Sequence, residues 1–289
     1  MEILKHNQRI IISLLLNNFN KMPRTRLAKL LFLLRQQNPG ANVLYDFFPY
    51  KFGPYSTLAF RDITKLSEKG WLYDTKPIEL VQSRESEALA EVKNLPQEIK
   101  LQLVQMNRRL GKLTDKKVTQ LVYKNYPEFC FLSEKAIAPH MRPHVKISVY
   151  TVGYEGENLD SFLNKLIQFG IKRLIDVRYN PNSRVWGFSK KTLGGWCQKV
   201  GIEYIHRREL GVPGKIRSNA TSKAAIRRLL WDYERNYLPT IPETLSELDR
   251  MVVESPSVLL CMERCSSMCH RGILAKYLHT KTGLPVIHL

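Results

Sequence analysis

The second half of the chain alternates short apolar runs with helical patterns, and this alternation restricts the fold more than any other feature. The apolar runs, which have the length of buried strands, lie at residues 147–152, 171–177, 202–205, 257–262 and 285–288. The segments between them that have helical composition lie at residues 159–169, 191–200, 222–237, 242–253 and 270–280. This order predicts an α/β domain over residues 146–289, with a mainly parallel sheet covered by helices on both faces.

The first part of the chain has a different pattern. Apolar residues recur at helical spacing in residues 4–19 and 25–36, an aromatic extended segment follows at 45–52, and a helix at 55–69 leads to a short strand at 71–75. Helix, helix, strand, helix and strand in this order are typical of a winged-helix-like module, which we expect over residues 1–76. The chain therefore combines a mainly helical first domain with an α/β second domain.

Residues 77–145 are predicted to form a helical connecting region. The segment from Glu85 to Arg109 has helix-forming composition, but Pro96 interrupts it, and Leu101, Val104 and Leu110 are too widely spaced for a long core helix. Prolines become frequent toward residue 145. We therefore expect two or three helices that end in a proline-marked linker.

The charge of the chain indicates the class of partner. Lys and Arg number 45 against 26 Asp and Glu, which gives a formal net charge of +19. A positive surface of this size favours a polyanion, of which a nucleic acid or a nucleotide is the commonest. The alternative is a basic surface that is simply solvated.

The chain is expected to be a cytoplasmic protein with no membrane partner. The apolar run Ile10–Leu16 is far shorter than the roughly 18 residues of a membrane span. The cysteines number five, and three of them crowd into one segment, unlike the even and dispersed cysteines of a secreted domain. Free thiols in a reducing compartment fit this pattern better.

Most of the reactive side chains follow the predicted strands. In parallel sheets, functional residues gather beyond the carboxyl ends of the strands. The polar and reactive residues at these ends are Tyr154, Asp176, Arg178, Ser183, Arg184, His206, Cys261, Glu263, Cys269, His270 and Arg271. We therefore expect them to share one rim of the sheet.

The motifs of the second half resemble a known family. TVGYEG, DVRYNPNSR, YIHRRELG and CMERCSSMCHR occur in the order and spacing typical of the bacterial and archaeal "domain of unknown function 488" family, over roughly residues 148–289. The resemblance implies an α/β fold and an activity related to nucleotides or nucleic acids. Cys265 stands where the family pattern is variable.

The first part resembles another family. RLAKLLFLL, YKFGPYS and LSEKGWL are similar to segments of the Panacea domain of SocA-like antitoxins, over roughly residues 5–75. The resemblance implies a protein-interaction or DNA-associated module, with Lys51, Tyr55 and Arg61 as contacts, and a link to phage defence or a toxin system. The alternative is that Gly53-Pro54 is an ordinary turn that begins a helix.

Four rim residues are candidates for catalysis. Asp176 and Glu263 are carboxylates on two strands, of which one can orient a partner and the other can act as a general base. Cys269 stands at a predicted helix start, where the helix dipole lowers a thiol pKa, so it is a candidate nucleophile or phosphate neighbour. His270 is a candidate proton shuttle. The alternative is a structural network that joins the strand ends.

The remaining rim residues are candidates for ligand binding. Arg178, Arg184 and Arg271 have planar guanidinium groups that suit phosphate oxygens. Tyr154 can stack on a base, and Trp186 and Phe188 either stack as well or belong to the core. The residues expected to bind a phosphate or another part of the ligand are Tyr154, Arg178, Ser183, Arg184, His206 and Arg271.

The three crowded cysteines also raise the question of a metal. The spacing of Cys261, Cys265 and Cys269 is not that of a zinc ribbon, and cysteines such as Cys261 and Cys265 are more often small buried hydrophobes. We therefore expect no cofactor, and zinc at these three cysteines, with His270 as a fourth ligand, is the alternative. The hypothesis for the whole chain is a hydrolase that cleaves a phosphoester or N-glycosidic bond in a nucleotide or nucleic acid. The alternatives are a non-catalytic reader of nucleic acid or modified nucleotides and a regulatory DNA-binding protein.

Overall fold

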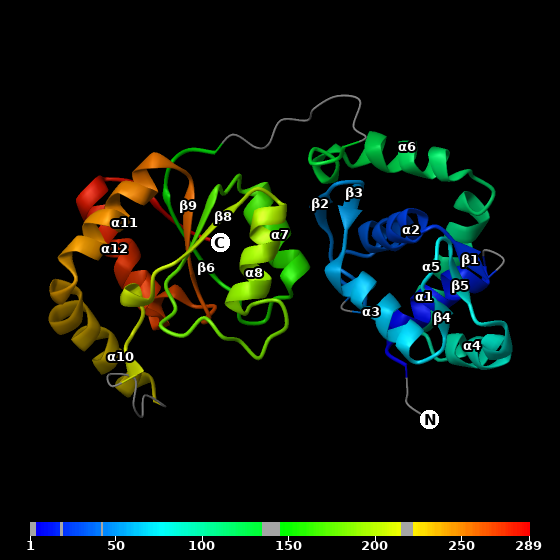
Figure 1. Cartoon of the computed structure of the whole chain (residues 1–289), viewed down its shortest axis with the longest axis horizontal. Helices are drawn as coiled ribbons and strands as arrows, with labels where there is room; N and C mark the ends of the chain where they lie inside the picture. The colour runs from blue at the N-terminus through cyan, green and yellow to red at the C-terminus, as the bar shows by residue number, and fades with distance from the viewer. Residues whose placement is uncertain (1–3, 18–19, 42, 135–144, 215–221) are drawn as a thin grey trace. The chain divides into compact units, whose positions relative to one another are not determined.

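The computed structural model describes residues 4–17, 20–41, 43–134, 145–214 and 222–289. The chain divides into two compact units, Met1–His140 and Met141–Leu289 (Figure 1). Most buried apolar residues of the first unit form one core cluster, and another cluster lies within the α/β unit.

The first unit is mainly helical, with short strands between its helices. Its elements are α1 (His6–Leu16), β1 (Lys21–Met22), α2 (Arg24–Gln37), β2 (Phe48–Tyr50), β3 (Gly53–Tyr55), α3 (Thr57–Glu68), β4 (Leu72–Tyr73), β5 (Ile78–Leu80), α4 (Glu85–Lys93), α5 (Gln97–Leu110) and α6 (Asp115–Asn125). Strands β1, β5 and β4 form one antiparallel sheet, and β2 and β3 form a hairpin. The expected helices and strands are present, together with strands that the sequence analysis did not separate.

One core joins the segment 1–76 to the segment that follows it. Helices α1 and α2 are buried on most of their surfaces, and α4 packs on α1 while α6 packs on α2. Helix α5 contributes Ile99, Leu103, Met106 and Leu110, all buried. These residues recur every three or four positions, which is the spacing of one helix face. The segment predicted as a connecting region therefore shares the core of the first unit, and the winged-helix assignment stays a prediction.

The second unit has the alternating order that the sequence predicts. Its elements are β6 (Val149–Gly153), α7 (Leu159–Gln168), β7 (Arg173–Asp176), α8 (Lys190–Lys199), β8 (Glu203–His206), α10 (Lys223–Asp232), α11 (Pro242–Glu254), β9 (Ser257–Cys261), α12 (His270–Thr282) and β10 (Val286–His288). A π-helical turn, Tyr233–Tyr237, continues α10. Each predicted run differs from the observed element by a few residues at its ends.

The five strands form one parallel sheet in the order β10-β6-β9-β7-β8. Helices α7 and α8 cover one face, and α11 and α12 cover the other (Figure 1). The predicted fold class, a parallel sheet with helices on both faces and a mainly helical first part, is confirmed.

The strand order determines where a ligand can bind. From β6 the chain crosses over β9 to reach β7, whereas from β9 it crosses in the opposite direction over β6 to reach β10. The connections that follow β6 and β9 therefore leave toward opposite faces of the sheet. A crevice opens at such a reversal, outside the carboxyl ends of the strands.

Two glycines allow the loop after β9 to lie against the strand ends. A Cβ on Gly153, the last residue of β6, would lie 1.9 Å from the carbonyl oxygen of Glu263. A Cβ on Gly272, in the first turn of α12, would lie 2.3 Å from the carbonyl oxygen of Ser266. Real Cβ atoms do not approach other atoms this closely, so the path of the loop requires glycine at both positions.

We predict that Gly153→Ala destabilises the second unit by about 1–3 kcal/mol, because the added methyl forces the Glu263 backbone away from the sheet. Gly195→Ala is the matched control. Gly195 lies inside α8 with no atom within 4 Å of the added Cβ, so alanine there should be neutral or stabilising by about 0.4–1 kcal/mol. Urea unfolding of the two variants measures both effects. Equal stability of the two variants would contradict the close contact at Gly153.

Candidate functional site

A pocket of about 610 Å³ lies at the carboxyl ends of the central strands. Its polar wall comes from the residues after β6, β7 and β9, and its apolar wall includes Val212 and residues of α10. The polar and reactive residues that line it are Tyr154, Arg178, Tyr179, Asn180, Asn182, Cys261, Glu263, Cys269 and His270. The crevice implied by the strand order is therefore a real pocket.

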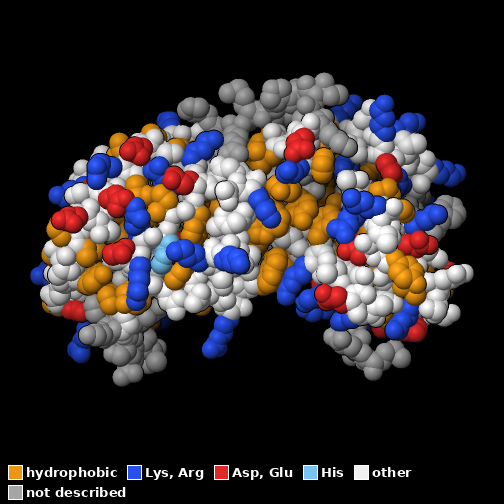
Figure 2. All heavy atoms as spheres, in the orientation of Figure 1, with side chains coloured by type: hydrophobic (Ala, Val, Ile, Leu, Met, Phe, Trp, Pro, Cys, Tyr) orange, Lys and Arg blue, Asp and Glu red, His pale blue; other side chains and the backbone are white. Residues whose placement is uncertain are grey.

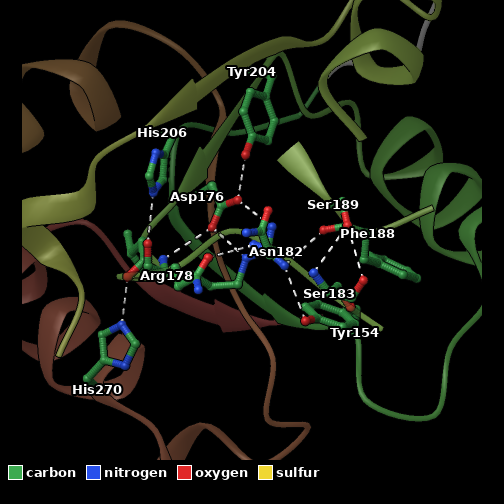
Figure 3. A network of polar contacts seen from close by, with 12 residues as sticks. Tyr154, Asp176, Arg178, Asn182, Ser183, Phe188, Ser189, Tyr204, His206 and His270 are labelled. Atoms are coloured by element: carbon green, nitrogen blue, oxygen red, sulfur yellow. Dashed lines mark hydrogen bonds and ion pairs between the residues drawn. The ribbon is translucent and has the colours of Figure 1, made fainter. Parts of the chain in front are cut away.

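A buried ion pair supports one side of the pocket. Asp176, the last residue of β7, is fully buried, and Arg178 is 5 % exposed. The Nε of Arg178 donates to Asp176 Oδ1 at 2.8 Å, and Nη2 donates to Oδ2 at 2.5 Å (Figure 3). The backbone N–H of Arg178 also donates to Oδ1, at 3.1 Å. Two fork-like hydrogen bonds and a backbone bond hold this charge pair in one geometry.

The remaining contacts of the pair reach three other segments. Arg178 Nη1 donates to the hydroxyl of Tyr154 at 3.2 Å and to the carbonyl of Phe188 at 2.9 Å. The hydroxyl of Tyr204, on β8, donates to Asp176 Oδ2 at 2.6 Å. The rings of Tyr154 and Phe188 stack with centroids 4.3 Å apart. Phe188 is fully buried, so it belongs to the core, whereas Tyr154 also borders the pocket.

The contacts with Asp176 change the pKa values of Arg178 and Tyr204. Burial alone would lower the pKa of Arg178, but the hydrogen bonds and charge of Asp176 outweigh it, so the pKa is raised. Burial, and then the charge of Asp176, raise the pKa of Tyr204. Both side chains therefore keep their protons at any physiological pH, and they act as fixed donors to Asp176.

A second cluster joins the end of β9 to the start of α12. The thiol of Cys261 donates to Glu263 Oε2 at 3.0 Å. The Nδ1 of His270 lies 3.9 Å from Cys261 Sγ and 3.8 Å from Cys269 Sγ. Cys261 and Cys269 are each 3 % exposed and His270 is 8 % exposed. Two thiols, an imidazole and a carboxylate thus lie together on the pocket wall.

The surroundings of this cluster change its proton affinities. Burial raises the pKa of the Cys269 thiol well above its ordinary value. Burial alone would lower the pKa of His270 and raise that of Glu263, but the contact with Cys269 raises the former and the hydrogen bond from Cys261 lowers the latter. The expected lowering of the Cys269 pKa by the helix start is therefore wrong in direction, because burial dominates. Glu263, by contrast, has a pKa below its ordinary value.

Two histidines are oriented by consecutive backbone carbonyls. His270 Nε2 donates to the carbonyl of Val177 at 2.9 Å, and His206 Nε2 donates to the carbonyl of Arg178 at 2.9 Å (Figure 3). Because a carbonyl only accepts, each ring carries its proton on Nε2 when it is neutral, and Nδ1 is then an acceptor. The His270 acceptor lies beside the two thiols.

The structure places the other predicted site residues away from the pocket wall. Arg271 is 1 % exposed and donates to the carbonyls of Glu263 and Arg264. Ser183 Oγ accepts the N–H of Val185 within its own turn. Arg184 is exposed and does not line the pocket. Arg271 thus holds the loop after β9, and Ser183 holds the turn before α8.

Sequence reasoning missed several residues of the site. Tyr204 supports Asp176; it stands in the predicted strand 202–205 and begins the YIHRRELG motif, but neither feature indicated this role. Asn180 and Asn182 line the pocket, and they stand inside the DVRYNPNSR motif that the sequence analysis quoted. The apolar wall from α10 had no sequence signal at all, since its orientation depends on how the helix packs.

We predict a graded loss of stability when the ion pair is altered. Asp176→Asn leaves the buried Arg178 without its counter-charge, so we expect a loss of about 3–5 kcal/mol in the unfolding free energy of the second unit. Tyr204→Phe removes one hydrogen bond to the carboxylate, for which we expect about 1.5–3 kcal/mol. Tyr73→Phe, at a side chain 56 % exposed in the first unit, is the control and should change nothing. Calorimetry checks the order, and an unchanged Asp176→Asn would contradict a structural role for the pair.

Comparison with protein families concerns the second unit, where residues 158–278 match a family model. No curated protein matches the chain, and the resemblance of residues 5–75 to the Panacea domain stays a prediction. The matched segment of the second unit runs from the start of α7 to near the end of α12, so it contains Asp176, Arg178 and the cluster from Cys261 to His270. Residues 158–278 match the family model described as "Domain of unknown function DUF488", which supports the family resemblance of the second half.

Proposed function

We propose that the second unit is a hydrolase that acts on a nucleotide, free or within a nucleic acid, in the pocket at the strand ends. The observation that carries the proposal is the position of Glu263. This carboxylate lies on the pocket wall beside two thiols and an imidazole, at a reversal of strand order. Strand-end pockets of this kind are the usual ligand sites of parallel sheets.

Glu263 is the proposed general base. Its carboxylate lies on the pocket wall, where it can accept a proton from a water molecule. The water oxygen then forms a bond to the electrophilic atom of the substrate while the bond to the leaving group breaks. The same carboxyl group returns its proton to the leaving group, so that one water molecule is consumed and Glu263 is regenerated.

The walls of the pocket suit a nucleobase. Tyr179 offers an aromatic ring, and stacking on such a ring tolerates every base, whereas the Tyr154 ring is buried against Phe188. Asn180 and Asn182 offer amides, which can both donate to and accept from a base edge. The apolar side chains of α10 form the opposite wall, where they can pack against the base.

The arginines favour one of the two proposed bond types. Arg178 already donates to Asp176, Tyr154 and Phe188, and Arg271 is buried on backbone carbonyls outside the pocket wall. Neither guanidinium is placed to clamp a phosphoryl group in this pocket. We therefore propose the N-glycosidic bond ahead of the phosphoester bond.

The first unit supplies the proposed contact with a polyanion. A second pocket of about 800 Å³ lies entirely in this unit, and Tyr50, Tyr55 and Phe60 contribute aromatic rings to it. The rings of Tyr55 and Phe60 stack with centroids 4.7 Å apart. The basic residues that line this pocket are Lys21, Arg24, Lys29, Lys51 and Lys76. Aromatic rings among cations are typical of surfaces that bind single-stranded nucleic acid.

Two of the three contact residues expected from the Panacea resemblance line this pocket. Lys51 and Tyr55 line this pocket, whereas Arg61 is not among its lining residues. Lys51 also forms an exposed ion pair with Glu134 at 3.3 Å.

Lys and Arg side chains are spread over the face drawn in Figure 2, in keeping with the net charge of +19. Throughout the described residues, the helices are too short or too polar for a membrane span.

Glu263→Gln should lower the rate of hydrolysis at least about 100-fold while ligand binding persists, since the amide cannot act as a general base. The measurement is chromatography of products from a panel of nucleotides and short DNA and RNA, because a released base identifies N-glycosidic cleavage and released phosphate identifies phosphoester cleavage. Glu243→Gln, exposed at the start of α11, is the matched control. Ligand binding by the wild type without any turnover would favour the alternative, a non-catalytic reader.

Replacing Lys21, Lys51 and Lys76 together by Gln should weaken nucleic-acid binding and flatten its dependence on salt. Each lost phosphate contact lowers the slope of log K against log salt by about 0.7 for single strands. The control replaces Lys112, Lys116 and Lys117, which are exposed in the same unit and do not line the pocket. Fluorescence anisotropy over a salt series measures both variants. Equal slopes for the two triple variants would contradict a role for this pocket.

A further inference from the structure

We propose that Cys261, Cys269 and His270 bind a zinc ion whose fourth position opens into the strand-end pocket. The two Sγ atoms and the His270 Nδ1 all lie within 4.8 Å of one another. All three residues line the pocket and all three are buried. Thiolate sulfur and imidazole nitrogen are the ligands that zinc prefers in proteins.

The spacing of the ligand atoms fits a tetrahedral ion. Bonds of about 2.3 Å to sulfur and about 2.05 Å to nitrogen place these two ligand atoms about 3.6 Å apart in a tetrahedron. The His270 Nδ1 lies 3.8 Å from Cys269 Sγ and 3.9 Å from Cys261 Sγ. Small side-chain adjustments therefore suffice to coordinate an ion.

The orientation of His270 is an independent argument. Histidines that bind a metal through one nitrogen usually donate the other N–H to a carbonyl or carboxylate, which fixes the ring. His270 Nε2 donates in this way to Val177, and Nδ1 is left facing the thiols. His206 is held by the neighbouring carbonyl in the same manner. Within the described part of the chain, however, His206 belongs to no group of metal-ligating side chains.

The loop that carries the ligands is held by contacts that do not use them. Cys261 ends β9, and Cys269 caps the start of α12. Arg271, in α12, donates hydrogen bonds to the backbone carbonyls of Glu263 and Arg264, which lie between the two cysteines in the sequence. The ligand positions are therefore set by the backbone, as a metal site requires.

Cys265 does not take part in the proposed site. It is exposed, and its Sγ lies 3.1 Å from Ser267 Oγ. The zinc alternative drawn from the sequence therefore loses Cys265 and keeps Cys261, Cys269 and His270. Three protein ligands with an open position are typical of catalytic zinc, whereas structural zinc sites are closed by four.

The role of Glu263 connects the metal to catalysis. Water in the open position would be made more acidic by the ion. Glu263 lines the same pocket and is the carboxylate proposed to receive the proton. This role rests on the proposed hydrolase function, whereas zinc binding does not.

The test is metal binding by the full chain. After chelation, the wild type should bind about one zinc per chain, and cobalt in its place should give a thiolate charge-transfer band and the strong visible bands of a tetrahedral site. Cys261→Ser, Cys269→Ser and His270→Gln should each weaken zinc binding by at least about tenfold. Cys265→Ser and His206→Gln are the matched controls and should bind as the wild type does.

Three results would overturn the proposal: no zinc bound by the folded wild type, dependence of binding on Cys265, or a disulfide between Cys261 and Cys269 in the chain purified under reducing conditions. If a ligand variant fails to fold, the cobalt spectrum of the wild type decides, since its charge-transfer intensity counts the coordinated thiolates. Glu263→Gln should retain the metal. Zinc binding without turnover by the wild type would therefore refute the hydrolase and support the metal site.

Discussion

The rim of the second unit depends on the ion pair between Asp176 and Arg178. A fully buried carboxylate is costly without a partner, and Arg178 supplies one only two residues further along the chain. The arginine must fold back to reach it, which sets the backbone path from Asp176 to Arg178. The carbonyls of Val177 and Arg178 lie on that path, and they orient His270 and His206. One charge pair thus determines how both imidazoles face.

The same pair shows how a buried arginine is held within the protein. A guanidinium that is desolvated needs several acceptors, and Arg178 finds them on three segments, at Asp176, Tyr154 and Phe188. Arg271 donates to two backbone carbonyls, although its buried Nε has no hydrogen-bond partner among the described residues. Their planar donors suit phosphate equally well, so residue type alone does not separate the two roles. Burial bears on the choice, because a buried guanidinium forms its hydrogen bonds with groups of the protein.

The alternation of apolar runs was sufficient to predict the parallel sheet, and the strand-end rule was sufficient to place Glu263, Cys269 and His270 on one pocket. The division of the rim into supporting and pocket-facing residues needs side-chain directions, which a linear sequence does not contain. The region after residue 76 shows a related limit. Leu101 and Val104, judged there for core spacing, are exposed, while α5 buries its neighbouring face into the first core. Ile99 and Leu103, which belong to the buried face of α5, lie two positions and one position before Leu101 and Val104 in the sequence.

The loop from Cys261 to His270 combines two requirements that usually conflict. A reactive cluster must be held still, yet the side chains that react are poorly suited to holding it. Here backbone atoms hold the loop in place. The carbonyl of Glu263 packs against Gly153 and accepts a hydrogen bond from Arg271. The side chains at the same positions can then face the pocket. The glycine that ends β6 is for this reason as much a part of the site as the carboxylate, although it has no reactive group.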